Sequence, residues 1–311
     1  MTGILYHEDF LSHITQIDHP ERPGRVTAIV NELKKEKYKN SLFWDTPRLA
    51  EEEEIEYVHS RSYIERVRAT AKSTPQYLDS PDTLVSKGSF QTALRAAGAV
   101  MTAIDGVIAG KYRRAFCPVR PPGHHAHYST AMGFCLFNNI AIGARHLKKK
   151  HNIQKILIVD FDVHHCNGTE EMLSGDTDIL LCSIHQHPHY PGTGLWSKLY
   201  AHSGGVLNAP LPPGSDESEY MKVFKGQLSD YVNMFMPDFV LMSAGFDSHR
   251  DDPLGDMMLA SDSYYRLTRE VVKFAETYCQ GKLVSTLEGG YNLRALAESA
   301  GYHVDALIES P

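Results

Sequence analysis

Residues 156–169 read ILIVDFDVHHCNGT, and this stretch decides the fold class. It opens with four aliphatic residues, which is typical of a strand buried on both faces of a parallel sheet. Asp160, Asp162 and His164 follow at once. Ligands of open parallel α/β sheets bind beyond the carboxyl ends of the strands. The stretch therefore predicts a buried strand that ends in a functional site.

Similar apolar runs recur along the chain and alternate with helical patterns. The runs are residues 4–6, 115–119, 179–184, 239–244 and 283–287, and the helix candidates are residues 89–110, 137–150, 217–236 and 261–280. In the first helix candidate, Ser89 is the expected N-cap and Gly110 the expected C-cap. This alternation predicts an α/β protein with a central parallel sheet flanked by helices. No repeat, low-complexity stretch or linker divides the chain, so we expect a single domain over residues 1–311.

The composition narrows the function. The chain of 311 residues has 31 Lys plus Arg against 38 Asp plus Glu, which gives a net charge of −7 with neutral histidines. Its basic residues are scattered apart from the LKKK run at 147–150, so we expect no nucleic-acid partner. With 42% hydrophobic and 22% charged residues, the protein is expected to be globular. The 17 histidines are many, and histidine is the commonest metal ligand and general base.

Cysteine usage and the first residues bear on localisation. The five cysteines form no CxxC pair and fall mostly in apolar runs, which is typical of a reduced intracellular protein. The stretch MTGILYHEDFLSH has no basic region, so no signal peptide is expected. No apolar run reaches the roughly 18 residues of a membrane-spanning helix. We therefore expect a cytoplasmic protein with no membrane association.

Chemically active side chains follow four of the predicted strands. His124 and His125 come after residues 115–119, and Asp247 comes after residues 239–244. Glu288 and Tyr291 follow the last run. Because the carboxyl ends of parallel strands share one edge of the sheet, these side chains are expected to gather beside the acids of the first stretch.

The spacing of two between Asp160, Asp162 and His164 puts the three side chains on one side of an extended segment. One Asp and one His from this strand end, together with Asp247, would form a site with three oxygen and nitrogen ligands. Three protein ligands leave a position open for water, as in catalytic zinc sites. Bound zinc lowers the pKa of that water to about 7, which makes hydroxide available. A plain polar strand end is the alternative for the Asp-x-Asp-x-His motif taken alone.

The tandem histidines are suited to moving protons for such a metal. Asp160 and Asn167 are candidates to hold the two rings from behind, and so to set their tautomers. Tyr291 follows two glycines, which permit a tight turn that aims its hydroxyl at a carbonyl oxygen. The alternatives are a histidine pair satisfied by backbone groups and a tyrosine buried in the core. The set predicts metal-assisted hydrolysis of an amide, because a phosphoester site would need a Gly-rich loop or an Arg clamp.

Six motifs in order resemble those of the zinc-dependent histone deacetylase family. They are RPPGHHA (120–126), GFCLFNN (133–139), DFDVHHCNGT (160–169), YPGTG (190–194), SAGFDSH (243–249) and LEGGY (287–291). HPERPGR (19–25) and the Asn in HHCNGT resemble the class II and bacterial deacetylase-like branch. The resemblance implies the arginase/deacetylase fold. It also implies an enzyme that removes acetyl or other acyl groups from lysine side chains in a protein or peptide.

The resemblance assigns roles residue by residue. One zinc ion would be held by Asp162, His164 and Asp247, and catalysis would use His124, His125 and Tyr291. The substrate would meet Asp82, Gly133, Phe134, Tyr190 and Leu254. A structural potassium ion would use Asp160, Ser183 and the carbonyls of Asp162 and His164. Hydroxamate-type inhibitors are expected to bind the open zinc position.

One residue departs from the family pattern. Cys166 stands where the family usually has Gly after the tandem histidines, and a positive φ there would strain a cysteine. The HQHPHY stretch (185–190) is interpreted as loop or rim, with His185 near the site.

Parts of the sequence are compatible with further functions. Acetylated polyamines or other small acylated amines are an alternative substrate class. The resemblance implies an acidic gatekeeper residue seven positions after the last zinc aspartate in polyamine deacetylases, and the apolar Leu254 at that position weakens this alternative. A dinuclear arginase-like hydrolase would need more carboxylates than Asn167 and Asp247 supply. A non-catalytic acyl-lysine binding module conflicts with the retained Tyr291. The oligomeric state is open, with a homo-oligomer among the options.

Overall fold

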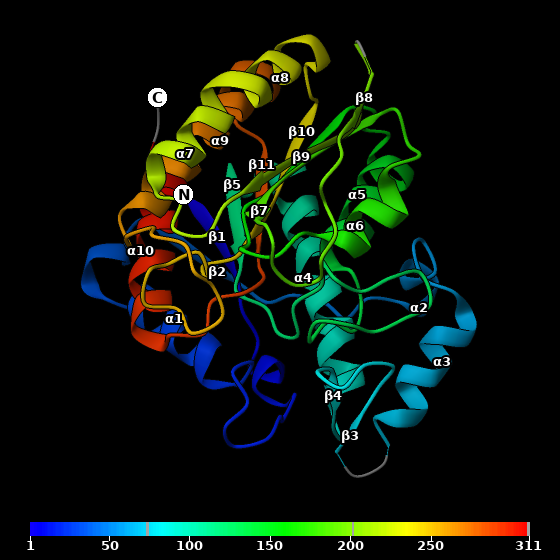
Figure 1. Ribbon diagram of the computed structural model, residues 1–311. Helices are drawn as coiled ribbons and strands as arrows, with labels where there is room; N and C mark the ends of the chain where they lie inside the picture. Colours follow the sequence, from blue (N-terminus) through cyan, green and yellow to red (C-terminus); the bar gives the residue numbers. More distant parts are fainter. Residues whose placement is uncertain (73–74, 201, 310–311) are drawn as a thin grey trace.

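The strand predicted at the start of residues 156–169 lies inside a large sheet. The computed structural model describes residues 1–72, 75–200 and 202–309 (Figure 1). In it, β6 (Ile156–Asp160) belongs to a nine-stranded sheet with the order β2-β1-β5-β11-β10-β6-β7-β9-β8. Every strand pair in this sheet is parallel except the short edge pair of β8 with β9. The predicted α/β class with one central parallel sheet is confirmed.

The other strands of this sheet are β1 (Thr2–Leu5), β2 (Leu42–Asp45), β5 (Arg114–Cys117), β7 (Ile179–Gln186), β8 (Lys198–Leu199), β9 (Gly205–Leu211), β10 (Phe239–Ala244) and β11 (Leu283–Leu287). A separate antiparallel pair is formed by β3 (Gln76–Tyr77) and β4 (Leu84–Val85). The α-helices are α1 (Gly24–Leu33), α2 (Glu52–Ile55), α3 (Arg61–Thr70), α4 (Ser89–Ile108), α5 (Asn139–His151), α6 (Asn167–Leu173), α7 (Glu217–Val223), α8 (Ser229–Phe235), α9 (Ser263–Cys279) and α10 (Leu293–Ile308). Short 3-10 turns, η1 (Glu8–Leu11) and η2 (Glu36–Tyr38), and a π segment, η3 (Phe224–Leu228), complete the elements.

Helices cover both faces of the sheet. In Figure 1, α4, α5 and α6 lie on one side, and α9 and α10, with α1 packed on α10, lie on the other. The inner strands are buried along their whole length, which explains their continuous apolar sequences. All these strands point the same way, so the loops after β5, β6, β10 and β11 meet at one edge.

The structure corrects two expectations about helices. Residues 217–236 form α7 and α8 rather than one helix, because the chain kinks at Gly226, whose φ and ψ are −101° and −112°. The N-cap of α4 is Gly88 and not Ser89, whose hydroxyl instead accepts a hydrogen bond from the Ser86 N–H at 2.9 Å. Gly110 lies just beyond the end of α4 with a φ of 73°, a conformation that glycine adopts without strain.

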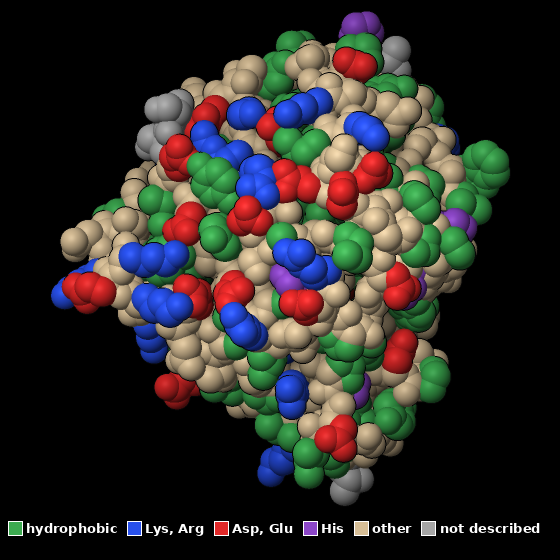
Figure 2. Space-filling view, turned by 60° about the vertical axis from the view of Figure 1, so that its left-hand side comes forward, with side chains coloured by type: hydrophobic (Ala, Val, Ile, Leu, Met, Phe, Trp, Pro, Cys, Tyr) green, Lys and Arg blue, Asp and Glu red, His purple; other side chains and the backbone are tan. Residues whose placement is uncertain are grey.

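Surface charge is mixed. Figure 2 shows Lys and Arg side chains interspersed with Asp and Glu over the face on which α9 and α10 lie. No helix within the described ranges is both long and apolar enough to cross a membrane.

Candidate active site

The predicted metal ligands meet at the shared strand edge. Asp162 and His164 follow β6, and Asp247 follows β10. His164 Nδ1 lies 2.9 Å from Asp162 Oδ1 and 3.2 Å from Asp247 Oδ2. One ligand atom from each residue falls within 4.8 Å of the other two, and all three residues are buried. The chain therefore offers a two-carboxylate, one-imidazole ligand set at the place predicted.

The carboxylates of this group fit a divalent cation. Asp247 Oδ2 is buried, and apart from the 3.2 Å contact with His164 Nδ1 it has no hydrogen-bonding partner among the described residues. Burial, and then the charge of Asp162, raise the pKa of Asp247. Two buried carboxylates that repel each other need a positive charge between them, because buried charges are costly unless paired or bound to a metal. Zinc accepts this combination of oxygen and nitrogen ligands.

Two glycines make room for the ligand group. A Cβ on Gly289 would lie 1.9 Å from Asp247 Oδ2, and a Cβ on Gly245 would lie 2.1 Å from Asp162 Oδ2. The Gly289 N–H also donates a hydrogen bond of 2.7 Å to Asp162 Oδ2. Any larger residue at either position would displace a carboxylate. The glycines of SAGFDSH and LEGGY thus shape the pocket around the three candidate ligands.

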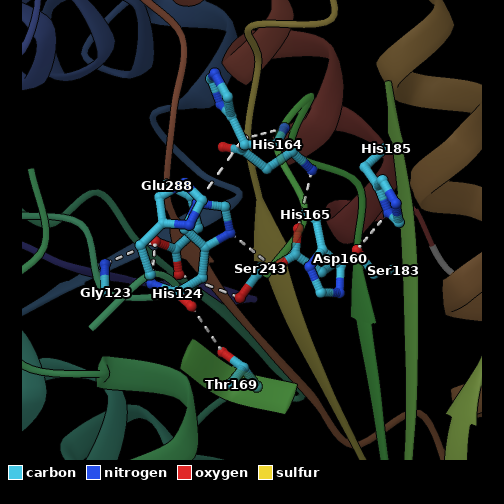
Figure 3. Close-up of polar contacts among 12 residues, drawn as sticks. Gly123, His124, Asp160, His164, His165, Thr169, Ser183, His185, Ser243 and Glu288 are labelled. Carbon is cyan, nitrogen blue, oxygen red and sulfur yellow. Dashed lines mark hydrogen bonds and ion pairs between the residues drawn. The ribbon is translucent and has the colours of Figure 1, made fainter. Parts of the chain in front are cut away.

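The tandem histidines are held from behind by the predicted partners. His124 Nδ1 lies 3.0 Å from Asp160 Oδ2, and His125 Nδ1 lies 2.7 Å from Asn167 Oδ1. Glu288 accepts hydrogen bonds from the N–H groups of Gly123 and His124 at 2.7 and 3.1 Å, which anchors the loop (Figure 3). An imidazole whose Nδ1–H donates to an amide oxygen leaves its Nε2 free to accept a proton.

The environments of the two histidines drive their pKa values apart. Burial disfavours the charged form of both rings. For His124 the carboxylates of Asp162, Asp160 and Glu288 outweigh burial and raise the pKa to about 10. Burial and the neighbouring His124 and His164 instead lower the pKa of His125 well below its ordinary value. Such a split suits a pair in which one ring is cationic and the other is a neutral base.

Tyr291 is fixed with its hydroxyl unpaired. Its backbone N–H donates to Asp252 at 2.6 Å, and the Arg25 guanidinium lies 4.8 Å from the ring centroid. The hydroxyl forms no hydrogen bond with any residue that the structure describes. Burial raises the pKa of Tyr291 well above its ordinary value, so the hydroxyl keeps its proton. It can therefore donate a hydrogen bond to a bound substrate.

A cavity of about 330 Å³ opens onto this site. All five residues predicted to contact the substrate line it, together with His125, His164 and Tyr291; the five are Asp82, Gly133, Phe134, Tyr190 and Leu254. Phe134 packs edge-on against Tyr291 at 5.8 Å, and Tyr190 against His125 at 5.2 Å. Aromatic walls around a narrow cavity suit an aliphatic chain that ends in an acyl amide.

The backbone at Cys166 is relaxed. Its φ is −79°, so cysteine is not strained there and the concern raised by the missing glycine is wrong. Nearby, Asp160 and Ser183 are register partners across β6 and β7, and the Ser183 hydroxyl lies 3.0 Å from His185 Nδ1 (Figure 3).

Sequence reasoning missed two residues of the site. His127 Nε2 lies 2.9 Å from Asn167 Nδ2, and His189 lines the cavity and stacks on His164 at 5.0 Å. Glu288 was expected at the site from its strand end, but its hydrogen bonds to the histidine loop were not predicted. His127 lies only two residues from the tandem histidines, which is the available signal. Pro188 interrupts the alternation of histidines, and this makes His189 resemble a rim residue.

Comparisons with known proteins agree with this geometry. The sequence profile of the histone deacetylase domain matches residues 19–307. The chain belongs to the histone deacetylase family. A crystal structure of the HDA15 HD domain superposes with a TM-score of 0.90 at 33% sequence identity, covering 99% of this chain and 91% of that one. The fold is therefore the arginase/deacetylase fold expected from the motifs.

Relatives come from diverse organisms. A probable deacetylase of Archaeoglobus fulgidus is 36% identical over 99% of this chain and 89% of its own length. Histone deacetylase 14, chloroplastic, of Arabidopsis thaliana is 38% identical over 93% of this chain and 73% of its own. The human polyamine deacetylase HDAC10 is 34% identical over 100% of this chain and 48% of its own. Together they support deacetylase activity on amides.

Proposed function

We propose that this protein is a zinc-dependent amidohydrolase that removes an acetyl or other acyl group from lysine side chains of a protein or peptide. The observation that carries the proposal is a cavity with aromatic walls that is also lined by His164, one member of the buried group of Asp162, His164 and Asp247. Bound zinc supplies Lewis acidity and lowers the pKa of a water molecule.

The residues of this chain perform the remaining tasks. Phe134 and Tyr190 enclose the aliphatic part of the acyl-lysine. The Tyr291 hydroxyl donates a hydrogen bond to the acyl oxygen as negative charge develops there. His125 takes a proton from the water that adds to the acyl carbon and returns it to the amine as the C–N bond breaks. His124, held by Asp160, stays cationic beside them.

Acetylated polyamines are a second candidate substrate class, and one observation favours them. Asp256 and Asp82 line the cavity, so its wall has acidic groups even though Leu254 is apolar. Asp256 Oδ2 accepts a hydrogen bond from Gln186 at 3.1 Å, which fixes the carboxylate in place. A second cationic centre on a polyamine would find these carboxylates.

A dinuclear hydrolase and a binding module are less well supported. Asn167 hydrogen-bonds with His125 and is absent from the ligand group, so its position supplies no carboxylate to bridge a second metal. A binding module has no use for the unpaired Tyr291 hydroxyl. The potassium ion at Asp160 and Ser183 and the cytoplasmic localisation stay predictions, and some relatives carry the label chloroplastic.

A substrate screen tests the proposed function. Purified, zinc-loaded protein is assayed against lysine peptides with acyl groups of graded length and against acetylated polyamines. We expect hydrolysis that excess chelator abolishes, that added zinc restores, and that a hydroxamate inhibits competitively. Amide hydrolysis that persists unchanged in excess chelator would refute metal catalysis. A higher kcat/KM on polyamines than on every peptide would transfer the proposal to the second substrate class.

A further inference from the structure

A second group of potential metal ligands lies between α4 and α5. Asp105 belongs to α4, and His146 and His151 belong to α5. Nε2 of His146 lies 2.7 Å from Asp105 Oδ1, and Nε2 of His151 lies 2.6 Å from the same oxygen. None of the three lines the catalytic cavity. One ligand atom from each residue lies within 4.8 Å of the others, as in the catalytic group.

The convergence of both rings on one oxygen is the informative feature. His146 is only 2% exposed, and its Nδ1 has no hydrogen-bond partner among the described residues. Its one polar contact is therefore the Nε2 atom aimed at Asp105. A buried imidazole normally forms hydrogen bonds through both nitrogens. In His146 only Nε2 has a polar contact among the described residues, and it is with the Asp105 oxygen that His151 also contacts. Imidazole nitrogen is a ligand that zinc and other late first-row ions prefer.

We propose that Asp105, His146 and His151 form a second, peripheral zinc site that ties α4 to α5. Three ligands and a water molecule would complete a tetrahedral shell. Zinc ligands at about 2.0 Å in a tetrahedron stand roughly 3.3 Å apart, so the present contacts would open by roughly 0.6 Å. Asp105 and His151 can make that adjustment because their side chains are 42% and 19% exposed.

The surroundings accept a cation. Asp105 and His151 lie in the last turns of their helices, where the unpaired carbonyl groups favour positive charge, and His146 lies in the turn before. Arg48, the cation that acts on Asp105, is held by Glu54 through two hydrogen bonds of 2.6 Å. Lys148 of α5 is bound by Asp176 and Asp178. The charges of Arg48 and Lys148 are thus engaged by other carboxylates.

Metal content separates this site from the catalytic one. Full-length protein is equilibrated with buffered zinc, and bound zinc is counted for four chains: wild type, Asp105→Asn, Asp247→Ala and the double variant. We expect two ions per chain in wild type, one in each single variant and none in the double variant. Asp105→Asn should hydrolyse substrate at the wild-type rate, because Asp105 is remote from the cavity. His151→Gln, at the more exposed of the two histidines, should repeat the loss of one ion without disturbing the buried His146.

Controls make the result specific. His7→Ala removes a partly exposed histidine that contacts a single carboxylate, Asp9, at 3.2 Å, and it should leave the zinc count unchanged. Zinc should raise the melting temperature of Asp247→Ala but not of the double variant. Equal zinc content in wild type, Asp105→Asn and His151→Gln would overturn the second site. If Asp247→Ala retained both ions, the catalytic ligand assignment would fail instead.

Discussion

Replacing Tyr291 by phenylalanine removes a single oxygen from the proposed site. The ring should stay where it is, because its edge contact with Phe134 at 5.8 Å and its stacking with Arg25 at 4.8 Å do not involve the hydroxyl. The backbone hydrogen bond to Asp252 is also kept. Because that hydroxyl has no partner among the residues that the structure describes, its loss leaves none of their buried groups unpaired.

The cost should therefore appear in catalysis and not in folding. Removing one donor to a developing oxyanion typically costs about 2.7–4 kcal/mol, which is a fall in kcat of roughly 10²- to 10³-fold. KM should change little, since the hydrogen bond strengthens only as charge develops on the acyl oxygen. The zinc content and the free energy of unfolding should stay close to those of wild type.

Steady-state kinetics on the best acyl-lysine peptide measures the effect. Tyr264→Phe is the matched control, because it deletes a buried and equally unpartnered hydroxyl that lies outside the cavity lining. That control should turn over within a few-fold of wild type. A Tyr291→Phe enzyme that keeps near-normal kcat would refute the role of this hydroxyl. A parallel loss in Tyr264→Phe would show that the effect is one of packing.

Three further predictions address other parts of the molecule. His127→Ala removes one of the two acceptors of Asn167 Nδ2 and leaves only Met132 Sδ at 3.2 Å, so the amide is held less firmly with its oxygen toward His125; kcat should fall about tenfold with zinc content unchanged, and unchanged kcat would exclude this positioning role. Leu254→Glu adds a carboxylate to the cavity wall and should shift relative kcat/KM toward acetylated polyamines by about tenfold, or ~1.4 kcal/mol, in competition assays; no shift would show that the wall does not sense the second charge. Burial lowers the pKa of His303 to about 3, whereas the pKa in the unfolded chain is near 6.5. The neutral ring therefore makes its full contribution to folding stability above pH 6.5, and this contribution declines as the pH falls toward 3. His303→Gln should flatten the pH dependence of the unfolding free energy by up to about 1.4 kcal/mol per pH unit over that range, as measured by urea titration, and an unchanged slope would mean that His303 does not titrate this way.

The site residues at the strand ends were predictable because residues that follow parallel strands lie at the same edge of the sheet. Each apolar run that precedes a site residue was recognised, and Asp162, Asp247 and Tyr291 follow the strands expected. Strand β9 was missed, since Asn208 and Pro210 interrupt its apolar pattern although the strand pairs with β7 along its length.

Contacts between side chains from distant loops could not be predicted from the sequence alone. The approach of His127 to Asn167 depends on how the loop after β5 folds back over the start of α6. The acid at position 256 enters the cavity only because Gln186, at the end of β7, holds it there. Spacing within a motif gives no measure of such distances.

The proposed catalytic ligand group can bind its metal only when distant parts of the chain have folded together. Val163 and Asp247, which share a hydrogen bond at the heart of the group, are 84 residues apart in sequence. The pocket between them is closed by Gly289, which arrives later still with β11. No single supersecondary unit contains the site, so the chain must complete its slow, long-range strand pairing before it can capture the ion. Zinc uptake at this site should therefore follow the last folding step, so the rate of zinc uptake can be used to measure the rate of that step.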